Sequence, residues 1–328
     1  MAHRIGFPRC LYYYTYFPFW KGFFETIGVE VVTSPPTSKE ILDRGVKEAI
    51  SDICMPIKLA FGHLLALPPD LDYIFLPRYV NVSKEDHVTF CPKFLALPDL
   101  VRATLSDLPP LLTPRIAFRE GRRATLRTLR EIASTFGVTS FWTVYRAYRR
   151  ALNLQRRYDQ LLQQGYLPDE AMAVLAGRKV DITRPEGDLT IAVVGFPYDL
   201  YDRFISLDLI KKLRSYGVRV VTPEMIPPQV LKKQLARLPK NLFWEFSNRV
   251  IRAALHYLHE EKVDGIIHVI AFACGPGTFV DKMLELETKE HGQVPFLSLT
   301  LDEHTGQAGF LTRLEAFVDM MRLRRMVS

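Results

Sequence analysis

Apolar residues in this sequence form short continuous runs that alternate with segments of helical spacing. In the first third, the runs "HRIGFP", "VEVVTS" and "DYIFLPR" predict strands at residues 3–8, 29–34 and 72–78. Apolar residues recur every three or four positions in the segments between them, which predicts helices over 16–27, 38–50 and 56–65. Ser38 suits the N-cap of the second helix. Strands that alternate with helices predict a parallel sheet.

The same alternation returns near the C-terminus. The predicted strands are "LTIAVVGF", "VRVVT", "GIIHVIAF" and "VPFLSLTLD", with helices expected over 204–216, 241–261, 279–289 and 311–324. Near-continuous apolar runs are typical of parallel strands that are buried on both faces. We therefore predict an α/β protein with two doubly wound, Rossmann/flavodoxin-like lobes at residues 1–115 and 187–328. A helical segment over 116–186 is expected to join them, with a cleft between the lobes.

The net charge of +7 comes largely from one segment, residues 115–157, which holds eleven arginines, two glutamates and no lysine. A solvated helix face explains this pattern, and a surface for an acidic partner or a phosphate-bearing group is the alternative. No recognised nucleic-acid motif accompanies it, so we do not expect nucleic acid as a partner. The sequence also lacks the glycine-rich loop with lysine that binds ATP phosphates.

Membrane insertion and export are not expected. No apolar run reaches the roughly 18 residues that span a bilayer. The aromatic N-terminal stretch "LYYYTYFPFW" has no small-residue cleavage site of a signal peptide. We therefore expect a cytoplasmic location.

The chain has four cysteines, and a disulfide framework is not expected in a cytoplasmic chain of this size. It has no Cys-x-x-Cys pair, so we expect neither a thioredoxin motif nor a zinc ribbon. Cys54, Cys91 and Cys274 each have a proline one or two residues later and each begins a predicted helical or turn segment. Three thiolates from distant loops are what a metal cluster at a domain junction needs. Three unrelated structural cysteines are the open alternative.

Ligands of open α/β sheets bind beyond the carboxyl ends of the strands. Several charged residues follow predicted strands there: Arg9, Arg78, Asp302, Glu303 and His304. The arginines suit a phosphate or carboxylate, while Glu303 and His304 suit acid–base chemistry or a loop that caps the last helix.

Two lysines and one histidine complete the candidates. Lys58 and Lys93 each follow a cysteine closely and would lower the charge cost of a cluster, with exposed lysines as the alternative. His268 lies inside an apolar run, so we expect a buried histidine with its hydrogen bonds satisfied.

Three long blocks carry a resemblance to a known family. They are "IGFPRCLYYYTYFPFWKGFFETIGVEVVTSPPTSKEILDRGVKEAISDICMPIK", "YIFLPRYVNV…FCPKFLALPDLV" and "LDEHTGQAGFLTRLEAFVDM". These blocks resemble the acyl-CoA dehydratase activase-related proteins, which are grouped with the 2-hydroxyglutaryl-CoA dehydratase D-component (2-hydroxyacyl-CoA dehydratase) superfamily. The resemblance covers most of the chain and is weakest through the arginine-rich segment.

The resemblance implies two α/β lobes around a 4Fe–4S cluster that is held by Cys54, Cys91 and Cys274. Cys10 is then expected to be structural, which leaves the fourth iron position open for water, sulfide or substrate. The alternative is that Cys10 is the fourth ligand. Electrons would come from a separate ATP-dependent activase with its own iron–sulfur cluster.

The implied chemistry belongs to anaerobic metabolism and takes two forms: dehydration of a 2-hydroxyacyl-CoA, or reduction of another small molecule. The alternative is a non-catalytic electron-transfer or scaffold subunit that pairs with a homologous dehydratase subunit. A dimer is expected in either case, and whether the chain is itself an enzyme stays open.

Overall fold

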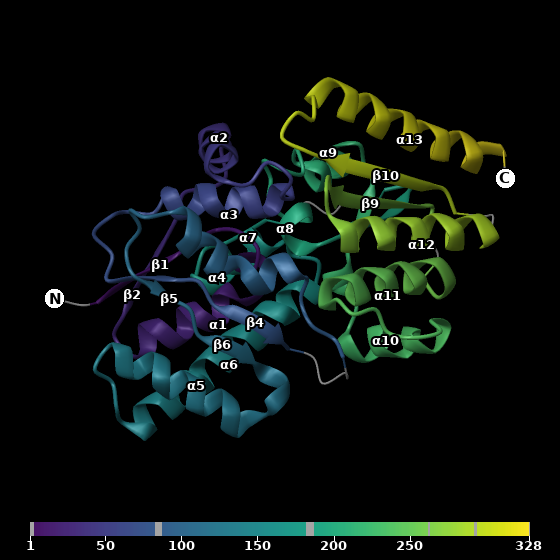
Figure 1. Ribbon diagram of the computed structural model, residues 1–328. Coiled ribbons are helices and arrows are strands. Elements are labelled where there is room, and N and C mark those ends of the chain that lie inside the picture. Colours follow the sequence, from purple (N-terminus) through teal and green to yellow (C-terminus); the bar gives the residue numbers. More distant parts are fainter. Residues whose placement is uncertain (1–2, 83–86, 182–186, 262, 292–293, 328) are drawn as a thin grey trace. The chain divides into compact units, whose positions relative to one another are not determined.

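The computed structural model describes residues 3–82, 87–181, 187–261, 263–291 and 294–327. The chain divides into two compact units (Figure 1). The N-terminal unit comprises Met1–Leu161, Pro168–Arg178 and Phe243–Glu245, and the C-terminal unit comprises Leu162–Leu167, Lys179–Leu242 and Phe246–Ser328. Each unit contains a four-stranded parallel sheet with helices, which confirms the predicted α/β class.

The sheet of the N-terminal unit has the strand order β2-β1-β3-β5. Its strands are short and all pair in parallel: β1 (Arg4–Phe7), β2 (Glu30–Thr33), β3 (Tyr73–Phe75) and β5 (Leu111–Leu112). Because β1 lies between β2 and β3, the sheet grows in both directions from its first strand, as in doubly wound folds. A separate two-stranded ladder joins β4 (Arg78–Asn81) to β6 (Arg115–Ala117).

Helix α1 (Tyr13–Thr26) contributes much of the core of this unit. Trp20, Phe23 and Phe24 are fully buried on it, and the Trp20 indole donates a hydrogen bond to the Tyr79 hydroxyl at 2.5 Å. The aromatic run near the N-terminus is therefore core packing, with its polar indole group satisfied inside.

Helices α2 (Lys39–Glu48) and α3 (Met55–Leu65) cross at very close range. Ser38 caps α2 as predicted, because its hydroxyl accepts a hydrogen bond from the Ile41 N–H at 3.3 Å. A Cβ on Gly45 would lie 2.0 Å from the Lys58 carbonyl oxygen, and one on Gly62 would lie 2.0 Å from the Ile41 carbonyl oxygen. The two backbones thus touch at a pair of glycines.

The segment predicted as a helical connection contains a 3₁₀ turn, η1 (Phe118–Glu120), and three helices: α5 (Arg122–Thr135), α6 (Phe141–Gln163) and α7 (Pro168–Leu175). Most of it belongs to the N-terminal unit. Helix α6 is tied to α1 there, since the Tyr158 hydroxyl donates to the Tyr14 carbonyl at 2.6 Å and the Gln155 amide donates to the Thr15 carbonyl at 2.9 Å. Residues 182–186 of the predicted connection lie outside the described residues.

A short piece from late in the sequence completes the N-terminal unit. Thr89, just before α4 (Pro92–Thr104), forms a parallel bridge with Trp244. The Thr89 N–H donates to the Phe243 carbonyl at 2.8 Å, and the Glu245 N–H donates to the Thr89 carbonyl at 2.9 Å.

The C-terminal unit has the strand order β10-β9-β7-β8, again all parallel. Its strands are β7 (Thr190–Gly195), β8 (Arg219–Val221), β9 (Gly265–Ala271) and β10 (Phe296–Leu301). Every residue of β9 is buried, as the unbroken apolar run predicts.

The α-helices of this unit are α8 (Pro197–Leu200), α9 (Leu209–Ser215), α10 (Pro228–Lys233), α11 (Glu245–His259), α12 (Gly275–His291) and α13 (Gln307–Val327). Two 3₁₀ turns, η2 (Pro223–Met225) and η3 (Gln234–Arg237), flank α10. Figure 1 shows β9 and β10 between α12 and α13. Along the described part of the chain, no helix has both the length and the apolar character needed to cross a membrane.

Candidate functional site

The three candidate cysteines occupy the same kind of backbone position. Cys54 is the N-cap residue of α3, Cys91 is that of α4, and Cys274 directly precedes α12. Each following helix has a proline in its first turn: Pro56, Pro92 and Pro276. The first turn of a helix leaves backbone N–H groups without partners inside the helix, and its dipole favours negative charge. Backbone N–H groups at such a position can donate hydrogen bonds to a cysteine sulfur.

Cys274 shows this most directly. The helix after it starts at Gly275, four residues earlier than the sequence predicted, so the Gly-Pro-Gly segment forms its first turn. The Gly277 N–H donates to the Cys274 Sγ at 3.3 Å. A Cβ on Gly277 would lie 3.1 Å from that sulfur and 3.0 Å from Ile270, so glycine gives the backbone its close approach.

Cys91 experiences opposing effects. The pKa of the Cys91 thiol lies above its ordinary value because burial outweighs the backbone N–H groups of Phe94 and Lys93 and the Lys93 ammonium, which lower it. Lys93 thus favours the thiolate. Lys58 is buried in α3, so it is not the exposed lysine that the sequence allowed as the alternative.

The donor chemistry fits an anionic iron–sulfur cluster, because each thiol stands at a helix N-terminus. Cys54 and Cys91 belong to the N-terminal unit and Cys274 to the C-terminal unit. Within the described residues, no three His, Cys, Asp or Glu side chains form a metal-binding group. Cys10 is buried after β1, and its carbonyl accepts a hydrogen bond from the Tyr13 N–H at 3.0 Å.

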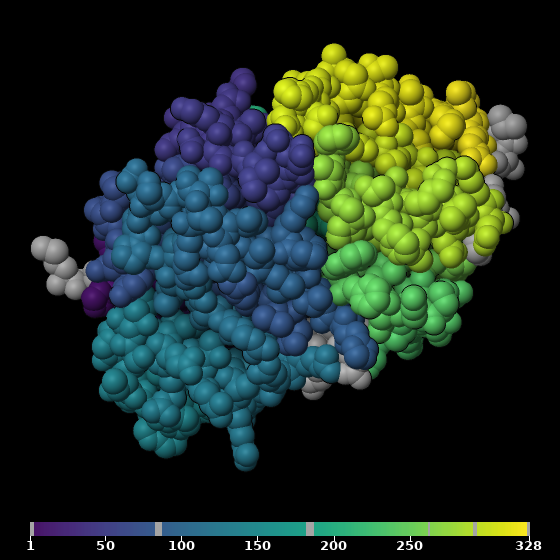
Figure 2. Space-filling view, viewed as in Figure 1, coloured from purple at the N-terminus to yellow at the C-terminus, as the bar shows by residue number. Residues whose placement is uncertain are grey.

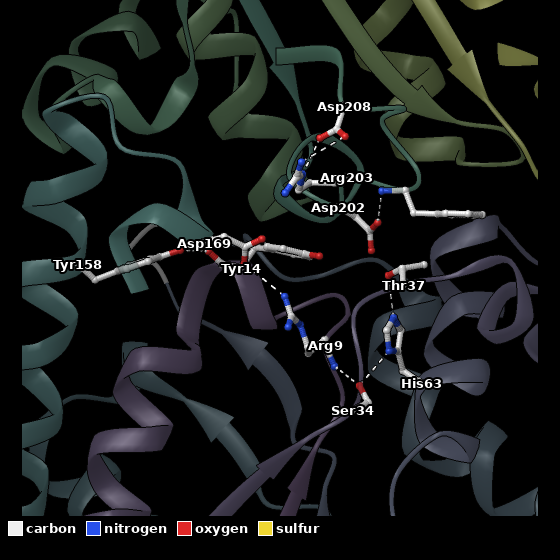
Figure 3. A network of polar contacts seen from close by, with 11 residues as sticks. Arg9, Tyr14, Ser34, Thr37, His63, Tyr158, Asp169, Asp202, Arg203 and Asp208 are labelled. Carbon is white, nitrogen blue, oxygen red and sulfur yellow. Dashed lines mark hydrogen bonds and ion pairs between the residues drawn. The ribbon is translucent and has the colours of Figure 1, made fainter. Parts of the chain in front are cut away.

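A polar network occupies the carboxyl edge of β1 and β2 (Figure 3). The Arg9 backbone N–H donates to the Ser34 hydroxyl at 2.9 Å, and that hydroxyl lies 2.9 Å from His63 Nδ1. His63 Nε2 lies 3.0 Å from the Thr37 hydroxyl. Burial, with a contribution from Arg9, lowers the pKa of His63 to about 3, so this histidine is neutral. The sequence analysis did not single out His63, although the apolar residues around it in α3 are a signal for burial.

The Arg9 side chain has partners within its own unit. Its guanidinium lies 3.4 Å from the Asp169 carboxylate and 5.1 Å from the centre of the Tyr13 ring. Arg9 does follow a strand, as predicted, but its charge is balanced by Asp169.

Arg78 differs from its predicted placement at a strand end. It is the first residue of β4, and its guanidinium donates to the Leu95 carbonyl at 2.7 Å and to Asp99 at 2.6 Å. Both partners belong to α4, so these contacts tie β4 to the helix that follows Cys91.

The loop after β10 forms the turn that the sequence offered as the alternative to acid–base chemistry. Asp302 Oδ1 accepts hydrogen bonds from the His304 N–H at 2.8 Å and the Thr305 hydroxyl at 2.9 Å. The Thr305 hydroxyl also accepts from the Asp302 N–H at 2.8 Å. His304 is exposed and Glu303 is half-buried. These hydrogen bonds of Asp302 therefore stabilise the turn that precedes α13.

His268 is a buried and satisfied histidine, as predicted. Its Nδ1 lies 2.6 Å from Asp281 Oδ1 on α12, and the side chain is almost fully buried in β9. This pair joins α12, which is the helix that follows Cys274, to strand β9 of the sheet.

The loop after β7 holds acidic residues that the sequence reasoning missed. Asp199 on α8 is 1% exposed, and neither carboxylate oxygen has a hydrogen-bond partner within the described residues. Burial, with a smaller effect of Asp202, raises the pKa of Asp199 well above its ordinary value. The neighbouring Tyr201 hydroxyl donates to the buried Glu224 carboxylate, which lies 3.5 Å from Arg249 Nε. The sequence signal for them is "DLYD", which begins four residues after the buried strand β7 ends.

The arginine-rich segment forms an open groove of about 590 Å³ on the N-terminal unit. Its lining includes Arg123, Arg127 and Arg130 of α5, which make no ion pair within the described residues, and Phe141 of α6. Trp142 beside it is 75% exposed. Figure 2 shows this part of α5 on the molecular surface in blue-teal. We name these five residues the arginine face.

Two family models match the chain. One, described as a CoA enzyme activase uncharacterised domain, matches residues 4–226, more than half of the chain. The other, described as 2-hydroxyglutaryl-CoA dehydratase, D-component, matches residues 170–321. The first match contains Cys54 and Cys91, and the second contains Cys274. A search of curated proteins found no match.

Proposed function

Because this chain belongs to the family described as the CoA enzyme activase uncharacterised domain and is similar to the 2-hydroxyglutaryl-CoA dehydratase D-component, we propose that it is an iron–sulfur protein. It accepts low-potential electrons for reductive chemistry on an acyl-CoA or another small molecule. One observation carries the proposal. Three cysteines within the matched regions each precede a helix whose first turn holds a proline.

Cys54, Cys91 and Cys274 are the proposed ligands of a 4Fe–4S cluster, which would supply one-electron transfer at low potential. The protein contributes hydrogen bonds to the ligand sulfurs, as the Gly277 N–H does for Cys274. Lys93 adds positive charge beside Cys91. Such contacts stabilise negative charge on sulfur and so raise the reduction potential of a bound cluster. Cys10 is proposed as structural, with a fourth-ligand role as the alternative.

The proposed electron donor is a separate ATP-dependent activase with its own iron–sulfur cluster. The sequence lacks a phosphate-binding loop with lysine, which supports a partner for ATP hydrolysis. The arginine face suits an acidic protein surface, since arginine and aromatic residues are enriched where proteins bind each other. A homologous dehydratase subunit is a further proposed partner.

A non-catalytic electron carrier or scaffold is the second candidate. Two observations favour it: Asp302 shapes a turn, and the charges of Arg9 and Arg78 are balanced by Asp169 and Asp99. These side chains therefore have structural roles that account for them without a substrate.

Anaerobic purification tests the cluster. We expect about four iron and four sulfide per chain. Replacing Cys54, Cys91 or Cys274 with alanine should remove most of the iron, and Cys10→Ala is the matched control that should retain it. Iron-free or zinc-only wild-type protein would contradict the proposal, and iron loss in Cys10→Ala alone would overturn the ligand assignment.

Electron transfer and turnover separate the two candidates. An iron–sulfur activase with ATP should bleach the visible absorption of this protein. Turnover of a 2-hydroxyacyl-CoA by the reduced protein then supports an enzyme, whereas reduction without turnover, followed by oxidation by a dehydratase subunit, supports a carrier.

A further inference from the structure

Asp199 is a buried acid of the C-terminal unit whose carboxylate is not used in a hydrogen bond within the described residues. Its side chain is 1% exposed, and both carboxylate oxygens lack hydrogen-bond partners within the described residues. Burial strongly disfavours an ionised carboxylate that has no partner, and such a group takes up a proton instead. Among the described residues, no hydrogen bond holds the carboxyl group in place, which is unusual for a buried polar side chain.

The electrostatic surroundings agree with a neutral acid. Within the part of the chain that the structure describes, the Asp202 carboxylate is the charge that acts on Asp199, and it disfavours a second negative charge. Helix α8 packs against β7 and β9. The only titratable side chain on these two strands is His268, which is engaged with Asp281.

Asp199 lies close in sequence to the carboxyl end of a sheet strand, where a ligand of the sheet would bind. Gly195 at the end of β7 pairs with Val269 of β9, and the two strands run in parallel. Asp199 follows β7 by four residues and Cys274 follows β9 by three, so both loops leave the same edge of the sheet at neighbouring strands. This is the edge at which α/β sheets bind their ligands.

We propose that Asp199 is a proton donor for the molecule that is reduced at the carboxyl edge of the C-terminal sheet. This inference rests on the proposed function for its electron source. When an oxygen atom of the bound molecule gains an electron from the low-potential donor, the Asp199 O–H bond breaks and the proton forms a new O–H bond on that oxygen. Asp199 is left as a carboxylate, which regains a proton from water before the next cycle.

Infrared spectroscopy of the cluster-free protein tests the protonation state without any activity. At neutral pH the wild-type protein should show the C=O band of a protonated carboxylic acid. The isosteric, neutral variant Asp199→Asn should lack that band, and Asp188→Asn, which removes an exposed aspartate of the same unit, should retain it. An Asp199 side chain that is ionised at neutral pH would overturn the proposal.

Two further measurements make the test robust. If Asp199→Asn does not fold, the wild-type protein with isotope-labelled aspartate carboxyls can be titrated by NMR, where one carboxyl should stay in the acid form at neutral pH. In folded protein, Asp199→Asn should keep its iron and its reduction by the activase but lose turnover about 100-fold or more. Unchanged turnover would refute the role, whereas iron-free wild-type protein would refute the proposed function and leave the infrared result standing.

Discussion

Replacing Gly62 with alanine should force α2 and α3 apart. The new Cβ would lie 2.0 Å from the Ile41 carbonyl oxygen, whereas ordinary contacts start at 3.4 Å, so the helices must separate by about 1.4 Å. The obstacle is backbone, which cannot turn away as a flexible side chain can. Overpacking of well-packed cores costs about 1–3 kcal/mol, and a backbone clash of this size belongs at the upper end, near 3 kcal/mol.

Urea unfolding followed by circular dichroism measures this loss, and thiol labelling of Cys54 measures its local effect. Because α3 begins directly after Cys54, a displaced helix should make this buried thiol react faster. Gly309→Ala is the control, since its Cβ meets nothing within 4 Å in α13, and it should be neutral or stabilising by up to about 1 kcal/mol. A Gly62→Ala protein that unfolds at the wild-type urea concentration would refute the close-crossing argument.

Three further predictions concern charge and capping. Native Asp199 holds a proton that the unfolded chain releases above about pH 4, so wild-type stability should fall with rising pH by up to about 1.4 kcal/mol per unit until the raised pKa of Asp199 is reached. Asp199→Asn should lack this component in urea titrations at successive pH values, and an unchanged slope would contradict the assignment. Ser38→Ala should lower the unfolding free energy by about 1 kcal/mol because α2 loses its cap, while Ser38→Asp should retain most of it; equal stability of all three proteins would show that the cap contributes nothing. Arg127→Ser with Arg130→Ser should weaken activase binding most at low salt, as measured by titration calorimetry at two ionic strengths, and a loss that is independent of salt would argue against charge pairing.

The long apolar runs made the C-terminal sheet predictable. A strand such as β9, whose residues are all buried, appears in the sequence as "GIIHVIA" without interruption. The start of α12 was not predicted because Gly-Pro-Gly is typical of a turn. Proline is nevertheless well tolerated in the first turn of a helix, where its missing N–H costs nothing. That difference placed Cys274 at a helix N-terminus instead of in a loop.

Buried polar groups were the least predictable part of the candidate site. The local pattern gives only a weak signal for Asp199 and His63, since their burial results from packing between distant segments. Short strands were also missed: β4 and β6 have three or four residues each and lie in proline-rich surroundings. The family resemblance rested on long blocks of sequence, and the two family models support it.

The bridge between Thr89 and Trp244 has a consequence for synthesis of the chain on the ribosome. The N-terminal unit contains Pro168–Arg178 and Phe243–Glu245 in addition to its first 161 residues. Its hydrogen bonds from Thr89 to Phe243 and from Glu245 to Thr89 therefore form only after residue 245 has left the exit tunnel. The N-terminal unit therefore lacks these hydrogen bonds, which lie next to the segment before Cys91, until most of the second half of the chain has been translated.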